Sequence, residues 1–327
     1  MFAARVPKGK AEGLRKYLKR KGLLNSKYRV FGSGEFIYFP VSQSADGKLA
    51  LKLKEMGAKI VAADFPSQRH KREKSQRLGY ELYGSIAVIE SDAGSAGAAG
   101  RSLMTSNKNI RTVLRKGSAV SGKYRTRKFL YVSGKKNFIA DYRENGCVFR
   151  FDIRKVFFST KLAFERKRVS GLVRDGESVI VMFAGVGPFA IEIAKSHSRC
   201  KVIAIELNSA ACRSMRENIR LNKTPNVIPE QGDVDRFAAK YAGFADRIIM
   251  PLPKESSKFL PTALRMSRKG CTIHYYTFCQ SGKADAAVAE LKGLVKARKR
   301  GFRLLAHRTV RPYSAVDEEI VVDFKLG

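Results

Sequence analysis

A short run of small residues in the C-terminal half of the chain forms the first candidate site. The apolar segment Val179–Met182 leads directly into Phe183–Pro188 (FAGVGP), which has two glycines and a proline suited to the first turn of a helix. Gly185 and Gly187 would let a ligand press against the backbone, because any Cβ would clash there. About twenty residues later Glu206 ends the next apolar run, where a carboxylate can bind the hydroxyls of a ribose. The pattern predicts a pocket for an adenosine-containing cofactor.

The glycine loop alone fits two kinds of cofactor. A nicotinamide dinucleotide site has the same loop, since Ala190 can replace its third glycine. Three features favour S-adenosylmethionine. Pro188 starts the helix where no pyrophosphate needs to be bound, Asp233 follows the third strand where an acid can hold the adenine amino group, and Pro251–Lys254 (PLPK) follows the fourth. The alternatives are a surface carboxylate for Glu206 and a helix cap for Asp233. The predicted cofactor contacts are Phe183, Gly185, Gly187, Glu206 and Asp233.

The elements that must position these residues alternate between strand and helix from residue 156 to residue 327. Such alternation is typical of a parallel sheet covered by helices on both faces. The fold class is therefore α/β, with a class I Rossmann-like domain whose seven-stranded sheet is mostly parallel. The predicted strands are Val179–Met182, Lys201–Ile205, Val227–Pro229, Arg247–Met250, Cys271–Thr277, Arg303–His307 and Glu319–Phe324. The predicted helices are Pro188–Ser196, Ala210–Leu221 and Lys258–Ser267.

Residues 63–155 have a different pattern and predict a middle α+β domain. Pro66–Leu78 is basic and has no clear periodicity, whereas Ser85–Glu90 alternates like a strand. Ser91–Gly100, rich in small residues, indicates a flexible turn before a helix. Three further strands should form an antiparallel sheet with a hairpin at Asn145-Gly146, and they are Lys128–Val132, Asn137–Tyr142 and Cys147–Asp152.

Residues 1–62 predict a small N-terminal α/β domain. Lys10–Gly22 has Leu14, Tyr17 and Leu18 spaced for one helix face, Phe36–Val41 is a strand pattern, and Gly47–Met56 is a second helix pattern. The polar face of the first helix is either a solvated surface or an RNA contact. Its cations are Lys8, Lys10, Arg15, Lys16, Lys19, Arg20 and Lys21.

The charge balance points to a polyanionic partner. The 64 Lys and Arg against 29 Asp and Glu give a formal net charge of +35, which exceeds what solubility requires and favours nucleic acid. Neither a bilayer-spanning apolar run nor a signal-peptide pattern is visible, which predicts a soluble cytoplasmic protein without membrane contact. The five cysteines form no C-x-x-C pair, so neither a zinc site nor a disulfide framework is indicated.

Several motifs resemble the archaeal and eukaryotic-type tRNA guanine-37 N1-methyltransferase family. The resemblance covers nearly the whole chain, and its motifs are specific in combination. They are RVPKGKAEGLRKYL (Arg5–Leu18), YRTRKFLYVSG (Tyr124–Gly134), YRENGCVFRFDIRKVFFS (Tyr142–Ser159), the pair Glu165-Arg166, MFAGVGPFAIEIAK (Met182–Lys195), ENIRLNK (Glu217–Lys223) and PLPKESSKF (Pro251–Phe259).

This resemblance implies a methyl transfer from S-adenosylmethionine to N1 of the guanosine that follows the anticodon of tRNA. It further implies a monomeric enzyme whose N-terminal domain binds the tRNA elbow and whose catalytic side binds the anticodon loop, with no metal. Glu165 would be the general base that removes the N1 proton, and Arg125 would stabilise the charge that develops on O6. Phe157 would stack on the target base. The fourth-motif residues Pro251, Pro253 and Lys254 would also bind the substrate.

Each of these roles has a simpler alternative. Glu165 could be a helix-surface partner of Arg166 or Arg168, Arg125 could be a phosphate contact, and Phe157 could belong to the core.

Two positions depart from the family pattern. Pro251 replaces the usual asparagine of the fourth motif, and Val181 replaces an acid that often precedes the Met-Phe-Ala-Gly run. The loss of the asparagine would suit a more open base pocket, so we expect a bifunctional member that also methylates C7 of 4-demethylwyosine at the same tRNA position. The alternatives are aminocarboxypropyl transfer in the wybutosine pathway and a non-catalytic tRNA-binding protein, with a dehydrogenase as a further rival that does not explain the charge.

Overall fold

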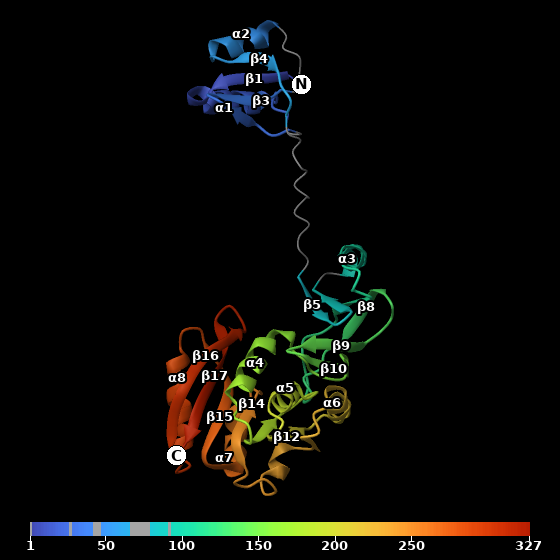
Figure 1. Ribbon diagram of the computed structural model, residues 1–327, viewed down its shortest axis with the longest axis vertical. Coiled ribbons are helices and arrows are strands. Elements are labelled where there is room, and N and C mark those ends of the chain that lie inside the picture. The colour runs from blue at the N-terminus through green and yellow to red at the C-terminus, as the bar shows by residue number, and fades with distance from the viewer. Residues whose placement is uncertain (1, 26–27, 42–46, 66–78, 91–92) are drawn as a thin grey trace. The chain divides into compact units, whose positions relative to one another are not determined.

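The computed structural model contains two compact units, Met1–Arg77 and Leu78–Gly327 (Figure 1). It describes residues 2–25, 28–41, 47–65, 79–90 and 93–327. The predicted basic segment Pro66–Leu78 therefore lies outside the described residues.

The first unit is a four-stranded antiparallel sheet with two helices. Its strands are β1 (Phe2–Pro7), β2 (Phe31–Ser33), β3 (Phe36–Pro40) and β4 (Lys59–Ala62), in the order β2-β3-β1-β4. The helices are α1 (Ala11–Arg20), preceded by the short turn η1 (Lys8–Lys10), and α2 (Gly47–Glu55). Leu14 and Leu18 of α1 are fully buried and Tyr17 packs against the same core, so the predicted apolar face is confirmed. All seven cations predicted for its polar face are exposed.

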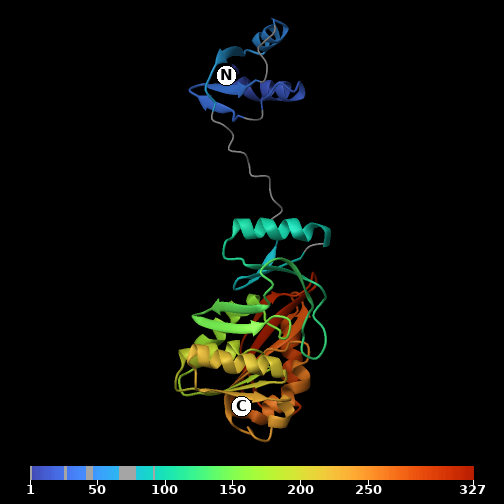
Figure 2. The ribbon, with the colours of Figure 1, turned by 90° about the vertical axis from the view of Figure 1, so that its right-hand side faces the viewer.

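The second unit begins with a small mixed sheet in the order β5-β6-β7-β8. Its strands are β5 (Tyr80–Tyr83), β6 (Ile86–Ile89), β7 (Thr112–Lys116) and β8 (Phe129–Gly134), and β6 runs parallel to β7. Helix α3 (Ala93–Ser106) packs on this sheet (Figure 2). The sequence predicts a flexible turn over Ser91–Gly100 and then a helix. The helix is present, but it begins at Ala93, so the predicted turn is wrong for Ala93–Gly100, while Ser91 and Asp92 lie outside the described residues. Small residues serve packing here, since a Cβ on Gly100 would lie 2.9 Å from Cγ1 of Val132.

The predicted three-stranded antiparallel sheet is only partly right. Strands β9 (Ile139–Glu144) and β10 (Cys147–Asp152) form the expected hairpin, with positive φ angles of 46° at Asn145 and 77° at Gly146. Strand β8 pairs with β7 and not with β9. Gly134 at the end of β8 lies very close to the backbone of Arg111, the residue before β7. A Cβ added to Gly134 would lie 2.3 Å from the carbonyl oxygen of Arg111, so only glycine allows this approach.

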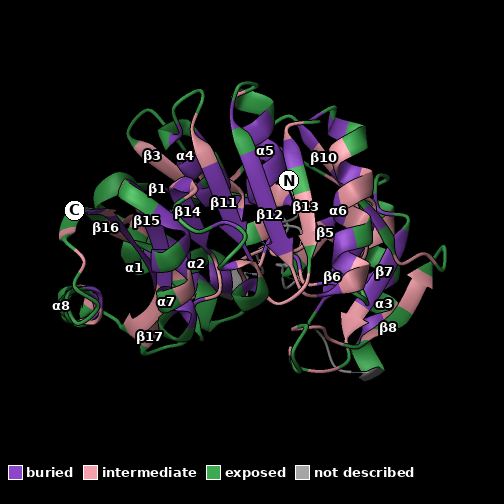
Figure 3. Ribbon diagram, turned by 90° about the horizontal axis from the view of Figure 1, so that it is seen from below, coloured by how far each residue is buried: buried purple, intermediate pink, exposed green. Residues whose placement is uncertain are grey.

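The main sheet has seven strands in the order β13-β12-β11-β14-β15-β17-β16, and β17 is antiparallel to both neighbours. The strands lie close to the predicted ranges: β11 (Ser178–Met182), β12 (Lys201–Glu206), β13 (Val227–Gln231), β14 (Ala245–Met250), β15 (Ser267–Gln280), β16 (Phe302–Pro312) and β17 (Asp317–Leu326). Apolar runs bury β11, β12 and β14 almost completely (Figure 3). The predicted mostly parallel α/β fold is confirmed.

Helices cover both faces of this sheet. They are α4 (Ala163–Leu172), α5 (Pro188–Ser196), α6 (Ser209–Asn222), α7 (Ser256–Met266) and α8 (Ala284–Lys296), with the short turns η2 (Thr160–Leu162) and η3 (Val234–Phe237). Residues of α5 and α6 belong to one apolar core and residues of α7 and α8 to the other. The two cores lie on opposite sides of the sheet because successive strand residues face opposite sides.

The small sheet, the β9–β10 hairpin and the main sheet share a core. Tyr83 and Leu114 of the small sheet and Phe149 of the hairpin pack in the same buried cluster as Val181 of the main sheet. Helix α6 packs beside the β9–β10 hairpin (Figure 2) and supplies a hydrogen-bond acceptor to its edge. Asn218 Oδ1 accepts a hydrogen bond from the Arg150 amide at 2.7 Å. The predicted boundary after residue 155 lies inside this second unit, and the division into three domains stays a prediction.

None of the described helices is both long and apolar enough to cross a membrane. The five cysteines are free thiols, of which four are buried and Cys279 is partly exposed. No group of three or more His, Cys, Asp or Glu among the described residues could hold a metal ion.

Candidate active site

The glycine loop makes the tight turn that the sequence predicts between β11 and α5. Phe183, Gly185 and Gly187 have φ angles of 55°, 59° and 90°, and Gly187 caps the helix that Pro188 begins. A Cβ on Gly187 would lie 2.9 Å from Cγ of Met215, so the glycine is needed for packing against α6. A Cβ on Gly185 would approach no described protein atom closer than 3.8 Å, so this side of the loop has room for a ligand.

Glu206 lies at the end of β12 and ties the loop to the sheet. Its Oε2 accepts a hydrogen bond from the Gly185 amide and its Oε1 accepts one from the Asn208 amide, both at 2.7 Å. Burial raises the pKa of Glu206, and the backbone hydrogen bonds act in the opposite direction. One oxygen is therefore bound to the glycine loop and the other to the turn that follows β12, so Glu206 is partly buried and its carboxylate is held in place.

Asp233 lies just after β13, beside the end of β12. The Gly232 amide donates to the carbonyl oxygen of Glu206 at 2.9 Å, which places the two acidic residues on neighbouring strand ends. Asp233 Oδ1 accepts a hydrogen bond from the Asp235 amide at 3.2 Å and so caps η3, as the simpler alternative expects. Phe183 packs edge-on against Phe259 of α7, with ring centroids 4.9 Å apart. The five predicted cofactor contacts thus meet at the carboxyl ends of β11, β12 and β13, where α/β folds bind ligands.

A second feature is a pocket of about 590 Å³ between the small sheet and the main sheet. Three predicted site residues line it, namely the predicted catalytic residue Arg125 and the predicted substrate residues Phe157 and Lys254. The Arg125 guanidinium lies 4.9 Å from the centroid of the Phe157 ring, and burial lowers the pKa of this arginine. Phe157 is partly exposed and not a core residue. The pocket therefore joins a cation and an aromatic face, the groups that a planar nucleobase needs.

The fourth motif follows β14 and reaches the pocket through Leu252 and Lys254. Pro251 and Pro253 do not line the pocket. Lys254 is exposed, and its Nζ lies 5.9 Å from the centroid of the Tyr313 ring.

The pocket lining is strongly basic, which the sequence did not reveal in full. Tyr313 and four additional cations line it without having been predicted. Two of these cations could have been found from the motifs that carry the family resemblance, because Arg127 lies in Tyr124–Gly134 and Lys161 lies just after Tyr142–Ser159. The six cations are Lys116, Arg125, Arg127, Lys161, Lys254 and Arg311.

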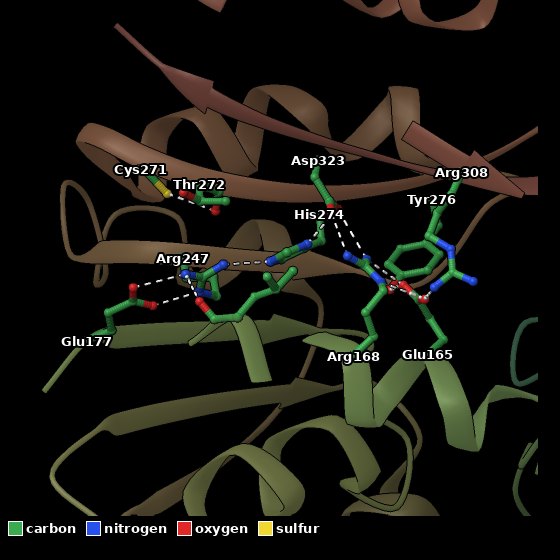
Figure 4. A network of polar contacts seen from close by, with 11 residues as sticks. Glu165, Arg168, Glu177, Arg247, Cys271, Thr272, His274, Tyr276, Arg308 and Asp323 are labelled. Carbon is green, nitrogen blue, oxygen red and sulfur yellow. Dashed lines mark hydrogen bonds and ion pairs between the residues drawn. The ribbon is translucent and has the colours of Figure 1, made fainter. Parts of the chain in front are cut away.

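Glu165 lies on α4 in a buried polar network (Figure 4) and is not among the residues that line the pocket. Its side chain is 3% exposed. Arg168 donates to both carboxylate oxygens, at 2.9 Å through Nε and at 2.7 Å through Nη2. Tyr276 Oη donates to Oε1 at 2.6 Å, and Arg308 Nη1 donates to Oε2 at 3.3 Å. Glu165 is thus a partner of Arg168, but a buried one.

Arg166 belongs to a different cluster. It lies 2.5 Å from Glu144 and 3.7 Å from Glu192, in both cases measured from Nε to a carboxylate oxygen. All three side chains are nearly inaccessible to solvent. Burial and the neighbouring Glu144 raise the pKa of Glu192 to about 8. The cluster connects the β9–β10 hairpin to α4 and α5.

The strand order, the glycine loop and the two acids at neighbouring strand ends define a class I methyltransferase. Its net charge of +35 is opposite in sign to that of nucleic acid. The TRM5/TYW2 methyltransferase domain matches residues 140–304, and the tRNA methyltransferase 5 N-terminal domain matches residues 3–50. The chain belongs to the TRM5/TYW2 methyltransferase family.

Similar proteins extend over the whole chain. The tRNA (guanine(37)-N(1))-methyltransferase Trm5b of Pyrococcus abyssi is 34% identical over 100% of this chain and 99% of its own length. The structure of the complex of aTrm5 and tRNALeu covers 100% of both chains with a TM-score of 0.68 and 27% identity. The tRNA (guanine(37)-N(1))/4-demethylwyosine(37)-methyltransferase Taw22 of Nanoarchaeum equitans is 26% identical over 65% of this chain and 88% of its own length.

Proposed function

We propose that this protein transfers the methyl group of S-adenosylmethionine to N1 of guanosine 37 in tRNA. The observation that supports this most directly is the basic pocket beside the glycine loop, because Arg125 and Phe157 meet there. A nucleobase is planar and its O6 accepts hydrogen bonds, so one aromatic ring and one guanidinium can bind it. The cofactor supplies the electrophilic methyl group, and the residues of the chain bind, orient and deprotonate the base.

The cofactor site uses the five residues at the strand ends. Gly185 leaves room for the ligand, and Gly187 sets the turn. Glu206 would bind the ribose hydroxyls and Asp233 the adenine amino group, while the Phe183 ring would form one wall.

The chemistry of N1 methylation assigns the remaining roles. N1 of guanine carries a proton that has to leave when N1 is methylated, and we assign the base that would accept this proton to Glu165. Arg125 would stabilise the charge that develops on O6. The longest of the Glu165 contacts described above is the one between its Oε2 and Arg308 Nη1, at 3.3 Å, and the Arg308 side chain is 36% exposed. Arg308 is therefore the contact that has to open before the base can reach Glu165.

Lys254 lines the pocket and would bind the base, whereas Pro251 and Pro253 lie outside the lining and would hold the segment after β14 from which Lys254 reaches the pocket. The anticodon loop would contact the other pocket cations, Lys116, Arg127, Lys161 and Arg311, through its phosphates. The exposed cations of α1 in the N-terminal domain would contact the tRNA elbow. A monomeric protein that acts in the cytoplasm is part of this proposal, as is the division into domains at residues 1–62, 63–155 and 156–327.

A second substrate is proposed on the basis of Pro251. This residue has no side-chain amide to bind the base edge, and it lies outside the pocket lining. A pocket of about 590 Å³ has room for a tricyclic base. The protein would then also methylate C7 of 4-demethylwyosine at the same position. Failure to modify tRNA that already contains 4-demethylwyosine would remove this second activity.

The test uses S-adenosylmethionine labelled in the methyl group and two tRNA transcripts, one with G and one with A at position 37. Nucleoside analysis should find labelled 1-methylguanosine only in the G transcript, and Glu165→Gln should remove most of it. Label in the aminocarboxypropyl group of the cofactor distinguishes aminocarboxypropyl transfer. Binding of tRNA without any transfer would point to a non-catalytic role.

A further inference from the structure

The network around Glu165 continues into the main sheet (Figure 4). The Arg168 guanidinium lies between two carboxylates, because it also donates to Asp323 on β17 at 2.7 Å through Nη1. Asp323 Oδ1 is 2.6 Å from Nδ1 of His274 on β15. His274 Nε2 in turn is 2.8 Å from Nη1 of Arg247 on β14. A single line of contacts therefore connects α4 with three strands.

The contacts define the hydrogen-bond roles of the two His274 ring nitrogens. An arginine nitrogen can only donate, so His274 Nε2 must accept from Arg247. His274 Nδ1 faces Asp323, where it donates. Burial by itself would raise the pKa of Asp323, but the His274 and Arg168 contacts outweigh it and lower this pKa to about 2. At the other end of this line of contacts, Glu177 accepts two hydrogen bonds from Arg247, at 2.6 Å and 2.9 Å, and so holds Arg247 in place.

The planar guanidinium of Arg168 transmits this constraint to Glu165. Nε and Nη2 bind the two oxygens of Glu165 side by side, which fixes the plane of that carboxylate as well as its position. The orientation of Arg168 depends on Asp323, because Nη1 has no other hydrogen-bond partner among the described residues. His274 and Asp323 are 0% and 4% exposed, so water cannot replace a lost partner easily.

We propose that Asp323 and His274 are positioning residues for methyl transfer, which hold Arg168 and, through it, the carboxylate of Glu165. This inference rests on the proposed role of Glu165 as the base. Neither residue touches the pocket, so neither should contribute to substrate or cofactor binding. Their effect should appear in the chemical step, because a misplaced base slows proton removal without weakening the complex.

The experiment measures single-turnover methyl transfer to the G37 transcript with enzyme and S-adenosylmethionine at saturation. Asp323→Asn replaces a carboxylate, which accepts hydrogen bonds from His274 and Arg168, by a neutral amide. Arg168 then loses a charged partner. We expect the rate to fall by about 10- to 100-fold, whereas the Kd values for tRNA and cofactor stay within twofold. Asp246→Asn is the matched control, because Asp246 also pairs with an arginine, Arg268, and accepts a hydrogen bond from the backbone of the sheet, at Ser178.

The proposal is overturned if Asp323→Asn retains the wild-type rate, or if Asp246→Asn with the same loss of Tm is equally slow. Arg168→Lys is the second variant in case Asp323→Asn does not fold. It keeps the charge but cannot bind both oxygens of Glu165 side by side, and its rate should fall in the same way. A wild-type rate for folded Arg168→Lys also contradicts the proposal. Absence of methyl transfer by the wild-type protein would instead refute the proposed function itself. Full activity of Glu165→Gln would overturn the assignment of Glu165 as the base, and with it this inference, while the methyl transfer itself would stand.

Discussion

Two alanine substitutions in the glycine loop should separate cofactor binding from stability. Gly185→Ala adds a Cβ that meets no described protein atom within 3.8 Å, so its folding cost is mainly the φ angle of 59°. A left-handed conformation costs an L-residue about 1–2 kcal/mol. The same Cβ enters the space that we assign to the cofactor. We therefore expect a small loss of stability and a large loss of affinity for S-adenosylmethionine, of about tenfold or more.

Gly187→Ala should mainly lower the stability of the fold, whereas Gly185→Ala should mainly lower the affinity for the cofactor. Its Cβ would lie 2.9 Å from Met215 Cγ and 3.0 Å from Ile191 Cδ1, and the φ angle is 90°. Overpacking costs about 1–3 kcal/mol, and with the backbone strain the total is about 2–5 kcal/mol. Each kcal/mol lowers Tm by about 2–4 °C in a protein of this size.

Thermal unfolding with and without S-adenosylmethionine, together with calorimetric titration of the cofactor, measures both effects. Normal cofactor affinity in Gly185→Ala would refute the position that we assign to the cofactor. Wild-type stability of Gly187→Ala would show that the contact between the loop and α6 is not tight.

Three further predictions concern other parts of the chain. Arg125→Lys keeps the charge but loses the planar guanidinium over Phe157, so kcat for G37 should fall by about tenfold or more in steady-state assays while cofactor affinity is unchanged. Glu192 has its pKa raised to about 8 in the fold, so the wild type should lose stability as pH rises from 4.5 to 8. Glu192→Gln should flatten this slope by up to about 1.4 kcal/mol per pH unit in urea unfolding, and an unchanged slope would contradict the assignment. Lys16→Glu with Lys19→Glu should weaken tRNA binding and reduce its salt dependence, with little effect on S-adenosylmethionine binding, and an unchanged salt slope would exclude α1 from the interface.

The strands of the main sheet and the turn of the glycine loop could be predicted from the sequence. Long apolar runs such as Val179–Met182 specify buried parallel strands, and Gly187 followed by Pro188 specifies a turn into a helix. These signals are local, because an apolar run and a glycine followed by a proline each consist of residues that are neighbours in the chain. The motifs in combination also indicated the family.

Sequence reasoning failed where the decisive contacts are distant in the chain. Gly100 belongs to a helix because it packs on Val132, and Gly134 holds β8 along β7 through Arg111. Neither contact leaves a local pattern in the sequence.

Only the tertiary structure decided how Glu165 is held. Its partners Arg168, Tyr276 and Arg308 come from α4, β15 and β16, and Asp323 is 155 residues away from Arg168. A carboxylate and an arginine three residues apart predict a surface pair, whereas burial beneath two strands turns this pair into part of a network. The physical reason is that desolvation makes each buried charge depend on its partners, and the fold selects those partners from distant parts of the chain.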